Sequence, residues 1–300
     1  MNGQKVMDDS SIKIMVCTHK DYVMPADSIY LPIQVGKKLS DLELGIQSDQ
    51  DVERVECDNI SSLNPLYCEM TAMYWAWKNI RKVFPDVQYV GLCHYRRYFS
   101  AENHVLHDGL RMVKKFVKTS IHSVTGKEVA SVFFERTKTI HSLTDERFME
   151  STNKLKSLIP SADITTTIPI RFFCCNVREF FSVIGRIYID LLIEIVSHYY
   201  PDYTSALNSV LRGTSLCTAN MIILKTGLLD EYCMFVFGVL EKHMEMVKER
   251  AICLDPEREG IYSRVPGYLA EILTSTFIET KKNEAKILYT EKYFVRVPKS

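Results

Sequence analysis

The cysteine patterns of a zinc site or of a disulfide framework are missing from this sequence. Its nine cysteines are an odd, scattered set that never forms Cys-x-x-Cys, and the one adjacent pair, Cys174 and Cys175, is too tight for ordinary bridging. This usage fits a reducing compartment and argues against a structural metal. The sequence therefore predicts a cytoplasmic protein, with no sign of a metal site or a cofactor.

Long hydrophobic runs are also missing. The first residues, MNGQKVMDDSS, lack the apolar stretch of a secretory signal. The most apolar segment, 180–196, is interrupted by Arg186, Asp190 and Glu194 at every fourth position. That spacing predicts a helix with one charged stripe packed on a core, and contact with a membrane surface is the alternative.

An excess of charge of one sign is absent as well. The 37 Lys and Arg residues balance 37 Asp and Glu residues, so no overall field attracts nucleic acid. A P-loop and a Gly-rich phosphate turn are missing, which disfavours nucleotidyltransferases and sugar phosphatases that depend on a divalent metal. With 300 residues, the chain is long enough for one large domain with a sizeable core.

The most informative stretch that is present is Val87–Phe99, which reads VQYVGLCHYRRYF. Its apolar part is typical of a buried strand, and it ends in the cluster His94, Tyr95, Arg96 and Arg97. Strands of open α/β sheets deliver their last residues to the crevice where ligands bind. Because Arg offers rigid bidentate donors to phosphate, the cluster predicts a nucleoside-diphosphate ligand. Pairing of the arginines with surface carboxylates is the alternative.

The alternation of strand-like and helix-like segments predicts an α/β fold. We expect a Rossmann-like, GT-A-like mixed sheet that binds a nucleotide sugar and is flanked by helices, with a helical C-terminal part. Besides the strand that begins at Val87, the expected strands are 12–17, 52–57, 163–170 and 216–224. The expected helices are 65–83, 227–250 and 266–279, the first of them with Asn64 as its N-cap and Pro65 at its first position.

We expect a single domain over residues 1–300. Residues 104–160 are rich in Lys, Ser, Thr and His and show no clear sheet pattern, so we interpret them as a surface insertion or lid with a helix near 110–118. Residues 281–300 carry six Lys or Arg against two Glu, which predicts a basic tail. Such a tail is either simply solvated or held near anionic lipid.

This order of elements is that of the nucleotide-sugar-binding half of an α/β glycosyltransferase. In such folds an Asp-x-Asp motif usually holds a divalent metal against the diphosphate. Here the corresponding place holds 94–97, so cationic side chains are expected to stabilise the leaving diphosphate instead. The Asp-x-Asp at Asp49 and Asp51 lies in a polar loop and is interpreted as a solvated surface pair.

Five segments resemble the bacterial family known as domain of unknown function 4422, found among glycosyltransferases of capsular polysaccharide and exopolysaccharide biosynthesis. They are CTHK at 17–20, DNISSLNPLYCEMTAMYWAWKN at 58–79, YVGLCHYRRYF at 89–99, NMIILK at 220–225 and PGYLAE at 266–271. They follow the family's order and span most of the chain. Two features depart from the family. Glu271 is followed by Ile-Leu where the family has Arg-Leu, and a Tyr- and His-containing segment is not found in FFCCNVREFF.

The resemblance implies an enzyme, a hexosyltransferase that uses a nucleoside-diphosphate sugar. A UDP-sugar is the expected donor, and a galactofuranosyl donor is one option. The acceptor would be a saccharide, either a polysaccharide or a lipid-linked oligosaccharide, which is compatible with peripheral contact at the inner face of the cell membrane. No nucleic-acid partner is implied. Because of the departures, a catalytically inactive sugar-nucleotide-binding or scaffold subunit of polysaccharide assembly is the alternative function.

The resemblance also suggests which residues bind the donor. Thr18, His19 and Lys20 would meet the nucleotide from the first loop, and Asp58 would meet the ribose or base. The remaining donor-binding candidates are Asn59, Asn64, Tyr67, Glu69, Tyr95 and Asn220. An exposed turn is the structural alternative for His19 and Lys20.

The catalytic candidates begin with Arg96 and Arg97, which would clamp the diphosphate, and His94, which would donate to it or orient the sugar. An inverting transfer also needs a carboxylate to deprotonate the acceptor hydroxyl. Glu271 and Asp163 are the candidates for this base, and a third is Glu69 in the first turn of its helix, where the helix dipole alone favours a carboxylate.

Overall fold

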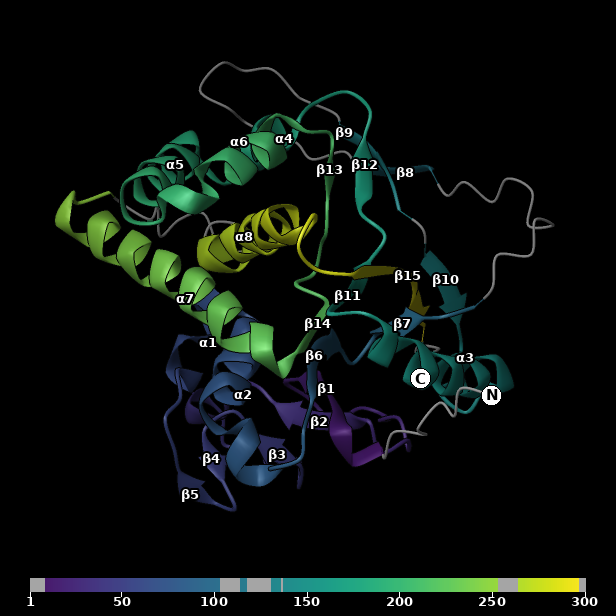
Figure 1. Cartoon of the computed structure of the whole chain (residues 1–300). Helices are drawn as coiled ribbons and strands as arrows, with labels where there is room; N and C mark the ends of the chain where they lie inside the picture. The colour runs from purple at the N-terminus through teal and green to yellow at the C-terminus, as the bar shows by residue number, and fades with distance from the viewer. Residues whose placement is uncertain (1–8, 103–113, 118–130, 136, 253–263, 297–300) are drawn as a thin grey trace.

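The structure is a computed structural model that describes residues 9–102, 114–117, 131–135, 137–252 and 264–296. In this part of the chain, a mixed sheet of nine strands has the order β10-β15-β11-β14-β6-β1-β2-β3, and β7 pairs with both β15 and β6. Helices cover both faces of the sheet (Figure 1). The predicted α/β class is therefore confirmed.

The strands of the main sheet are β1 (Ile12–Thr18), β2 (Tyr30–Gln34), β3 (Gln47–Ser48), β6 (Tyr89–His94), β7 (Arg97–Ser100), β10 (Thr137–Ile140), β11 (Ile164–Thr167), β14 (Ile222–Lys225) and β15 (Ile287–Val295). A smaller sheet contains β8 (Lys114–Val117), β9 (Ser131–Phe134), β12 (Ile170–Phe172) and β13 (Ser215–Leu216), and a hairpin is formed by β4 (Asp51–Val52) and β5 (Val55–Glu56).

The described helices are α1 (Asn64–Tyr67), α2 (Met70–Val83), α3 (Glu146–Leu158), α4 (Val177–Phe181), α5 (Arg186–Tyr199), α6 (Thr204–Arg212), α7 (Thr226–Glu249) and α8 (Val265–Lys281). The expected helices 227–250 and 266–279 correspond to α7 and α8. Among the described residues we find no helix whose length and hydropathy would suffice to span a membrane.

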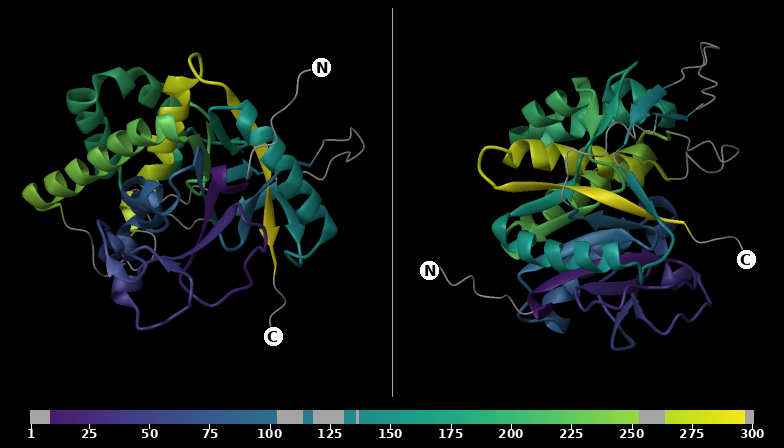
Figure 2. Two further views of the ribbon diagram at one scale, coloured as in Figure 1. Left: turned by 60° about the horizontal axis from the view of Figure 1, so that its bottom comes forward. Right: turned by 90° about the vertical axis from the view of Figure 1, so that its right-hand side faces the viewer.

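Alternation of side chains along the buried strands separates two cores, one on each face of the sheet. In β1, Met15 and Cys17 belong to the larger core, which includes residues of α2, α5, α7 and α8. Ile14 and Val16 point the other way, into a smaller core that includes residues of α3. Figure 2 shows α3 on the opposite side of the sheet from α7 and α8.

Strand direction decides which residues meet at the carboxyl end of β1. Strands β1 and β6 are parallel, and Cys17 is the register partner of His94. Strand β14 runs antiparallel to β6, with Ile222 opposite Leu92. The loop before β14 therefore lies at the same end of the sheet as His94. Because Leu92 faces the larger core, His94, two residues later, emerges on the face that carries α8.

The second strand of the sheet was predicted at 52–57, and this prediction is wrong. The sheet neighbour of β1 is β2, while 51–56 forms the short hairpin of β4 and β5. Glu53 and Arg54 between the two strands have φ of 50° and 66°. Such left-handed conformations produce a tight turn, so the chain reverses where a continuous strand was expected.

The helix expected over 65–83 is divided at Cys68, whose φ is 52°. Asn64 does not act as its N-cap, because helix α1 begins at Asn64 itself and Leu63 precedes it without a capping side chain. Instead the Asn64 side-chain amide donates to the Cys68 carbonyl at 2.7 Å and so satisfies the backbone at the break. As a result Glu69, expected in a first helical turn, occupies the N-cap position of α2.

Three further expectations differ from the structure. The helix expected at 110–118 lies mostly outside the described residues, and its described part, 114–117, is strand β8. Residues 137–158, assigned to an insertion or lid, supply β10 and α3 to the main fold. The basic tail 281–300 contains β15, a strand inside the main sheet, where Lys292 is 2% exposed. Composition alone does not distinguish such a strand from a solvated tail.

The interpretation of Asp49 and Asp51 as a solvated surface pair is wrong for Asp49, which is fully buried. Its carboxylate accepts hydrogen bonds from the backbone amides of Gly36 (2.8 Å) and Lys37 (3.2 Å). It also accepts from the hydroxyls of Ser61 (2.5 Å) and Thr71 (2.6 Å). A buried carboxylate requires such donors. Asp49 thereby ties the loop after β2 to the start of α2.

We expect Asp49→Asn to lower the free energy of unfolding by about 2–3 kcal/mol, because an amide nitrogen cannot accept and leaves a buried donor unpaired. Asp51→Asn is the matched control and should cost less than about 1 kcal/mol, since the half-buried Asp51 side chain accepts from the Ser48 hydroxyl. Urea unfolding of the two variants measures the difference. Equal losses would contradict the assigned role of Asp49.

Candidate active site

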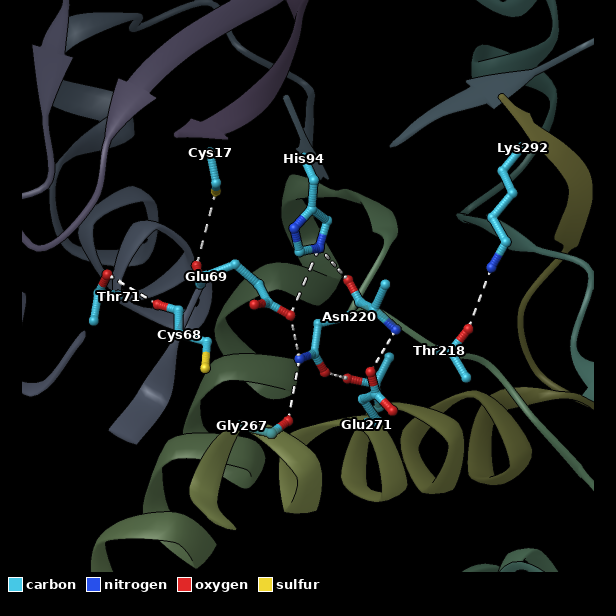
Figure 3. A network of polar contacts seen from close by, with 12 residues as sticks. Cys17, Cys68, Glu69, Thr71, His94, Thr218, Asn220, Gly267, Glu271 and Lys292 are labelled. Atoms are coloured by element: carbon cyan, nitrogen blue, oxygen red, sulfur yellow. Dashed lines mark hydrogen bonds and ion pairs between the residues drawn. The ribbon is translucent and has the colours of Figure 1, made fainter. Parts of the chain in front are cut away.

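A cavity of about 740 Å³ lies where the ends of β1 and β6, the loop before β14 and the first turns of α8 meet. Volumes of this size are typical of small-molecule sites. Cys17 and His94 come from the strand ends, Glu69 from the start of α2, and Glu271 from α8. Figure 3 shows how these polar groups converge between the strands and α8.

His94 is held by the loop before β14. Its Nε2 lies 2.9 Å from the carbonyl oxygen of Ala219 and 3.7 Å from Glu69 Oε1. A carbonyl oxygen only accepts hydrogen bonds, so Nε2 carries a proton and donates. The Nε2 edge of the ring therefore faces both a backbone carbonyl and a carboxylate.

Asn220 joins the carboxylate of Glu69 to helix α8. Its side-chain amide donates to Glu69 Oε1 at 2.8 Å and to the carbonyl of Gly267 at 3.3 Å. Asn220 is 1% exposed, and its φ is 48°; that of Ala219 is 63°. Two consecutive left-handed residues without glycine are uncommon and mark a backbone held by its surroundings. Ala219 and Asn220 also interrupt the strand expected at 216–224, which the structure divides into β13 and β14.

Glu271 also lines the cavity, and it accepts from the Ala219 amide at 2.7 Å. Burial raises the pKa of the Glu271 carboxyl to about 7. The Ala219 amide opposes this shift, the negative charge of Glu69 adds to it, and the positive charges of Lys292 and Arg97 oppose it. Glu271 is therefore poised to hold or release a proton near neutral pH.

One face of α8 supplies several cavity residues that the sequence patterns did not single out. Gly267 and Tyr268 line the cavity and lie four and three positions before the predicted Glu271, on the same helix face, and Arg264, the N-cap residue of α8, lines it as well. A Cβ on Gly267 would lie 3.1 Å from the sulfur of Cys68, so glycine lets α8 approach the break after α1. Tyr268 could have been predicted from the sequence, because it precedes Glu271 by three positions in the expected helix and so shares its face.

Positive charge gathers at the mouth of the cavity. His19, Arg97 and Arg264 line it. Burial lowers the pKa of His19, and the charges of Lys20, Arg264 and Arg96 lower it further. The part of this shift that is due to charge indicates a cationic environment around His19.

The two adjacent arginines are placed differently. Arg97 lines the cavity, whereas the exposed Arg96 is not among its lining residues and lies over the Tyr95 ring at 5.3 Å. Lys20 is likewise exposed, with its Nζ 5.3 Å from the centre of the same ring. Tyr95 itself lines the cavity. The predicted clamp of Arg96 and Arg97 on the diphosphate is therefore not formed by both side chains, because of the two only Arg97 lines the cavity.

Several predicted donor-binding residues have structural partners away from the cavity lining. The buried Thr18 hydroxyl donates to the Lys20 carbonyl at 2.6 Å and shapes the first loop. Asp58 accepts from the hydroxyl of Tyr74, and the Asn59 amide donates to backbone carbonyls at 50 and 57. Tyr67 is buried in the larger core. Asn64, by contrast, both stabilises the helix break and lines the cavity.

Asp163, one of the two leading candidates for the catalytic base, lies at the other end of the sheet. Its backbone carbonyl accepts from the Lys225 amide, and Lys225 is the register partner of Tyr89 at the start of β6. Its carboxylate accepts from the Lys286 amide at 3.0 Å. Strand β14 lies between β11, which follows Asp163, and β6, which ends at His94, and it is antiparallel to both, so Asp163 and His94 stand at opposite ends of the sheet. The assignment of Asp163 as base is therefore withdrawn.

The aromatic wall of the cavity is defined here as Phe180, Phe181 and Tyr268, which all line it. It combines the end of α4 with α8. The centres of the Phe181 and Tyr268 rings are 6.3 Å apart, and those of Phe180 and Phe181 are 5.2 Å apart. One cavity thus offers cations, a carboxyl with a raised pKa and an apolar ring surface.

Comparison with known proteins begins with a solved structure described as the WbbM bifunctional glycosyltransferase in its apo form. The two folds align with a TM-score of 0.69 at 23% sequence identity, over 95% of this chain and 45% of that one. This chain spans less than half the length of that protein, and the likeness shows the fold alone. A comparison with curated proteins finds no match. The family described as domain of unknown function (DUF4422) matches residues 13–283. Since this match covers most of the sequence, the chain belongs to the family of domain of unknown function 4422.

Proposed function

We propose that this chain is a glycosyltransferase that moves a hexosyl unit from a nucleoside-diphosphate sugar to a saccharide acceptor. UDP is the expected nucleotide, galactofuranose is one option for the sugar, and a polysaccharide or lipid-linked oligosaccharide is the expected acceptor. The proposal is carried by the convergence, in one cavity, of cationic side chains and the Glu271 carboxyl, whose pKa is about 7. A GT-A-like interpretation of the sheet fits the fold likeness to a protein described as a glycosyltransferase.

The donor diphosphate is assigned to the cationic mouth. Arg97 and Arg264 supply guanidiniums from β7 and from the start of α8, and His19 supplies an imidazole from the first loop. Guanidiniums hold phosphate oxygens in fixed geometry, and they stabilise the charge that develops on the leaving diphosphate. Because bound diphosphate favours protonated imidazole, its binding should raise the pKa of His19.

The chemical step is assigned to Glu271. An acceptor hydroxyl oxygen attacks the anomeric carbon while the bond from that carbon to the diphosphate oxygen breaks, and the hydroxyl proton passes to the Glu271 carboxylate. The diphosphate leaves with the bonding electron pair. His94, which donates to Ala219, keeps the Ala219 loop in place, and the Ala219 amide in turn orients Glu271. Such positioning of a base with a pKa near the working pH is what general base catalysis requires.

Calorimetric titration of the purified protein with a panel of nucleotide sugars tests this proposal. We expect one UDP-sugar to bind with a Kd of about 1 µM to 1 mM, the usual range for enzyme substrates, and 5 mM EDTA to leave that Kd unchanged because protein cations hold the diphosphate. Addition of saccharide acceptors should then release UDP. Absence of binding to every nucleotide sugar would overturn the proposal, and binding without release of UDP would favour an inactive binding subunit.

A further inference from the structure

The chemistry of the cavity changes from its mouth to its aromatic wall. The cationic groups of the mouth can hold a diphosphate. The half-buried rings of Phe180 and Tyr268 do not offer phosphate oxygens a comparable set of hydrogen-bond donors. Aromatic faces instead suit ligands with an apolar face and polar edges. A neutral sugar ring has this character, since its C–H groups gather on one face and its hydroxyls project from the rim.

We infer that the aromatic wall is the acceptor subsite, where Tyr268 and Phe180 stack on the terminal sugar ring of the acceptor and present one of its hydroxyls to Glu271. This inference rests on the proposed function and adds to it the location of the acceptor. It assigns specificity for a neutral saccharide to residues separate from those that bind the donor.

Spacing on α8 supports the arrangement. Tyr268 precedes Glu271 by three positions, so the ring and the carboxyl are neighbours on one helix face. Arg264, the N-cap residue of α8, lines the same cavity. The charge of Glu271 raises the pKa of Tyr268, after the larger effect of burial, and Arg264 opposes it. A sugar stacked on Tyr268 therefore lies between the group that accepts its proton and the cation assigned to the donor.

The aromatic wall is held in shape before any ligand arrives. Helix α4 begins with a capping box in which the Asn176 side chain accepts from the Glu179 amide at 2.8 Å and the Glu179 carboxylate accepts from the Asn176 amide at 2.8 Å. Behind the wall, Phe180 packs on Phe172 with ring centres 4.4 Å apart. A rigid surface loses little conformational freedom on binding, which favours recognition of a flexible saccharide.

The test compares acceptor kinetics in four variants. Octyl hexopyranosides serve as acceptor probes, UDP release measures transfer, and calorimetry with UDP measures donor binding. Tyr268→Leu and Phe180→Leu should each raise the acceptor KM by about 10-fold, the scale of one lost aromatic contact, with the Kd for UDP unchanged within about twofold. Tyr268→Phe keeps the ring and should restore the wild-type KM. Phe173→Leu is the control, since Phe173 is 60% exposed in the same segment and outside the cavity lining.

The outcomes separate the two proposals. Wild-type acceptor KM in Tyr268→Leu and Phe180→Leu would overturn the acceptor subsite while leaving the proposed function intact. A parallel loss of UDP binding in these variants would also overturn it, because the wall would then belong to the donor. Failure of the wild-type protein to bind UDP or to transfer sugar to any probe would overturn the proposed function itself, and the subsite with it. Far-UV circular dichroism of each variant verifies that it is folded.

Discussion

Glu271→Gln is expected to lower kcat for sugar transfer by about 10²–10⁴-fold, the usual contribution of a general base. The amide has the size of the carboxyl and its oxygen still accepts from the Ala219 amide, which now bonds to Glu271 Oε1 at 2.7 Å. The loop before β14 should therefore keep its shape, and the Kd for UDP should stay within about threefold because the donor is held by separate cations. Single-turnover transfer together with UDP calorimetry separates the two effects. A variant with wild-type kcat would exclude Glu271 as the base.

The pH dependence of activity provides an independent check on the same residue. A base must be deprotonated, so kcat/KM should rise with pH up to about 7, the pKa of Glu271, and then level off. Glu69→Gln removes a negative charge that raises this pKa, and it should move the rising limb to lower pH. An unmoved limb in Glu69→Gln would show that another group controls it.

The raised pKa of Glu271 also makes the stability of the fold depend on pH, in the direction opposite to that of activity. Burial raises the pKa of Glu271 from its ordinary 4.5 to about 7, so folding favours the protonated form. The associated stability is fully present below about pH 4.5 and is lost as the pH rises through 7. The stability of Glu271→Gln minus that of the wild type should thus be more favourable at pH 8 than at pH 5. Urea midpoints at the two pH values measure this, and an unchanged difference would indicate that Glu271 titrates normally.

Arg97→Met should weaken binding of UDP by about 10–100-fold, the loss expected for one charge-assisted contact of roughly 1.5–3 kcal/mol. Methionine preserves the apolar stem that packs near Phe294, whose ring centre is 6.0 Å from the Arg97 guanidinium. The effect should diminish at high salt, because an electrostatic contact at a cavity mouth is partly screened. Calorimetric titrations at low and high ionic strength provide the measurement.

Arg96→Met is the matched control for this prediction. Arg96 is adjacent in sequence and carries the same charge, but it is exposed over Tyr95 and does not line the cavity. It should weaken UDP binding by less than about threefold, as expected for an exposed charge at a distance. Equal losses in the two variants would show that the site attracts the diphosphate through overall charge and that Arg97 makes no specific contact.

Local sequence patterns were sufficient for much of the framework. The apolar run 12–17 and the abrupt change at His94 identified β1 and the end of β6, because a buried strand needs continuous apolar residues whatever surrounds it. The long amphipathic periodicity of 227–250 identified α7 for a similar reason. Patterns failed where single residues decide the backbone, as at Cys68 and Asn220, whose left-handed conformations divide a helix and a strand.

By itself, the sequence determined the α/β class, the family, and the cationic strand end at 94–97, since all three depend on residues close together in the chain. Only the tertiary structure decided which distant residues share the cavity. The antiparallel direction of β14 brings Ala219 to His94 and sends Asp163 to the far end of the sheet. The packing of α8 adds Arg264 and Tyr268. The direction of a strand and the docking of a helix are set by long-range contacts, which local periodicity does not encode.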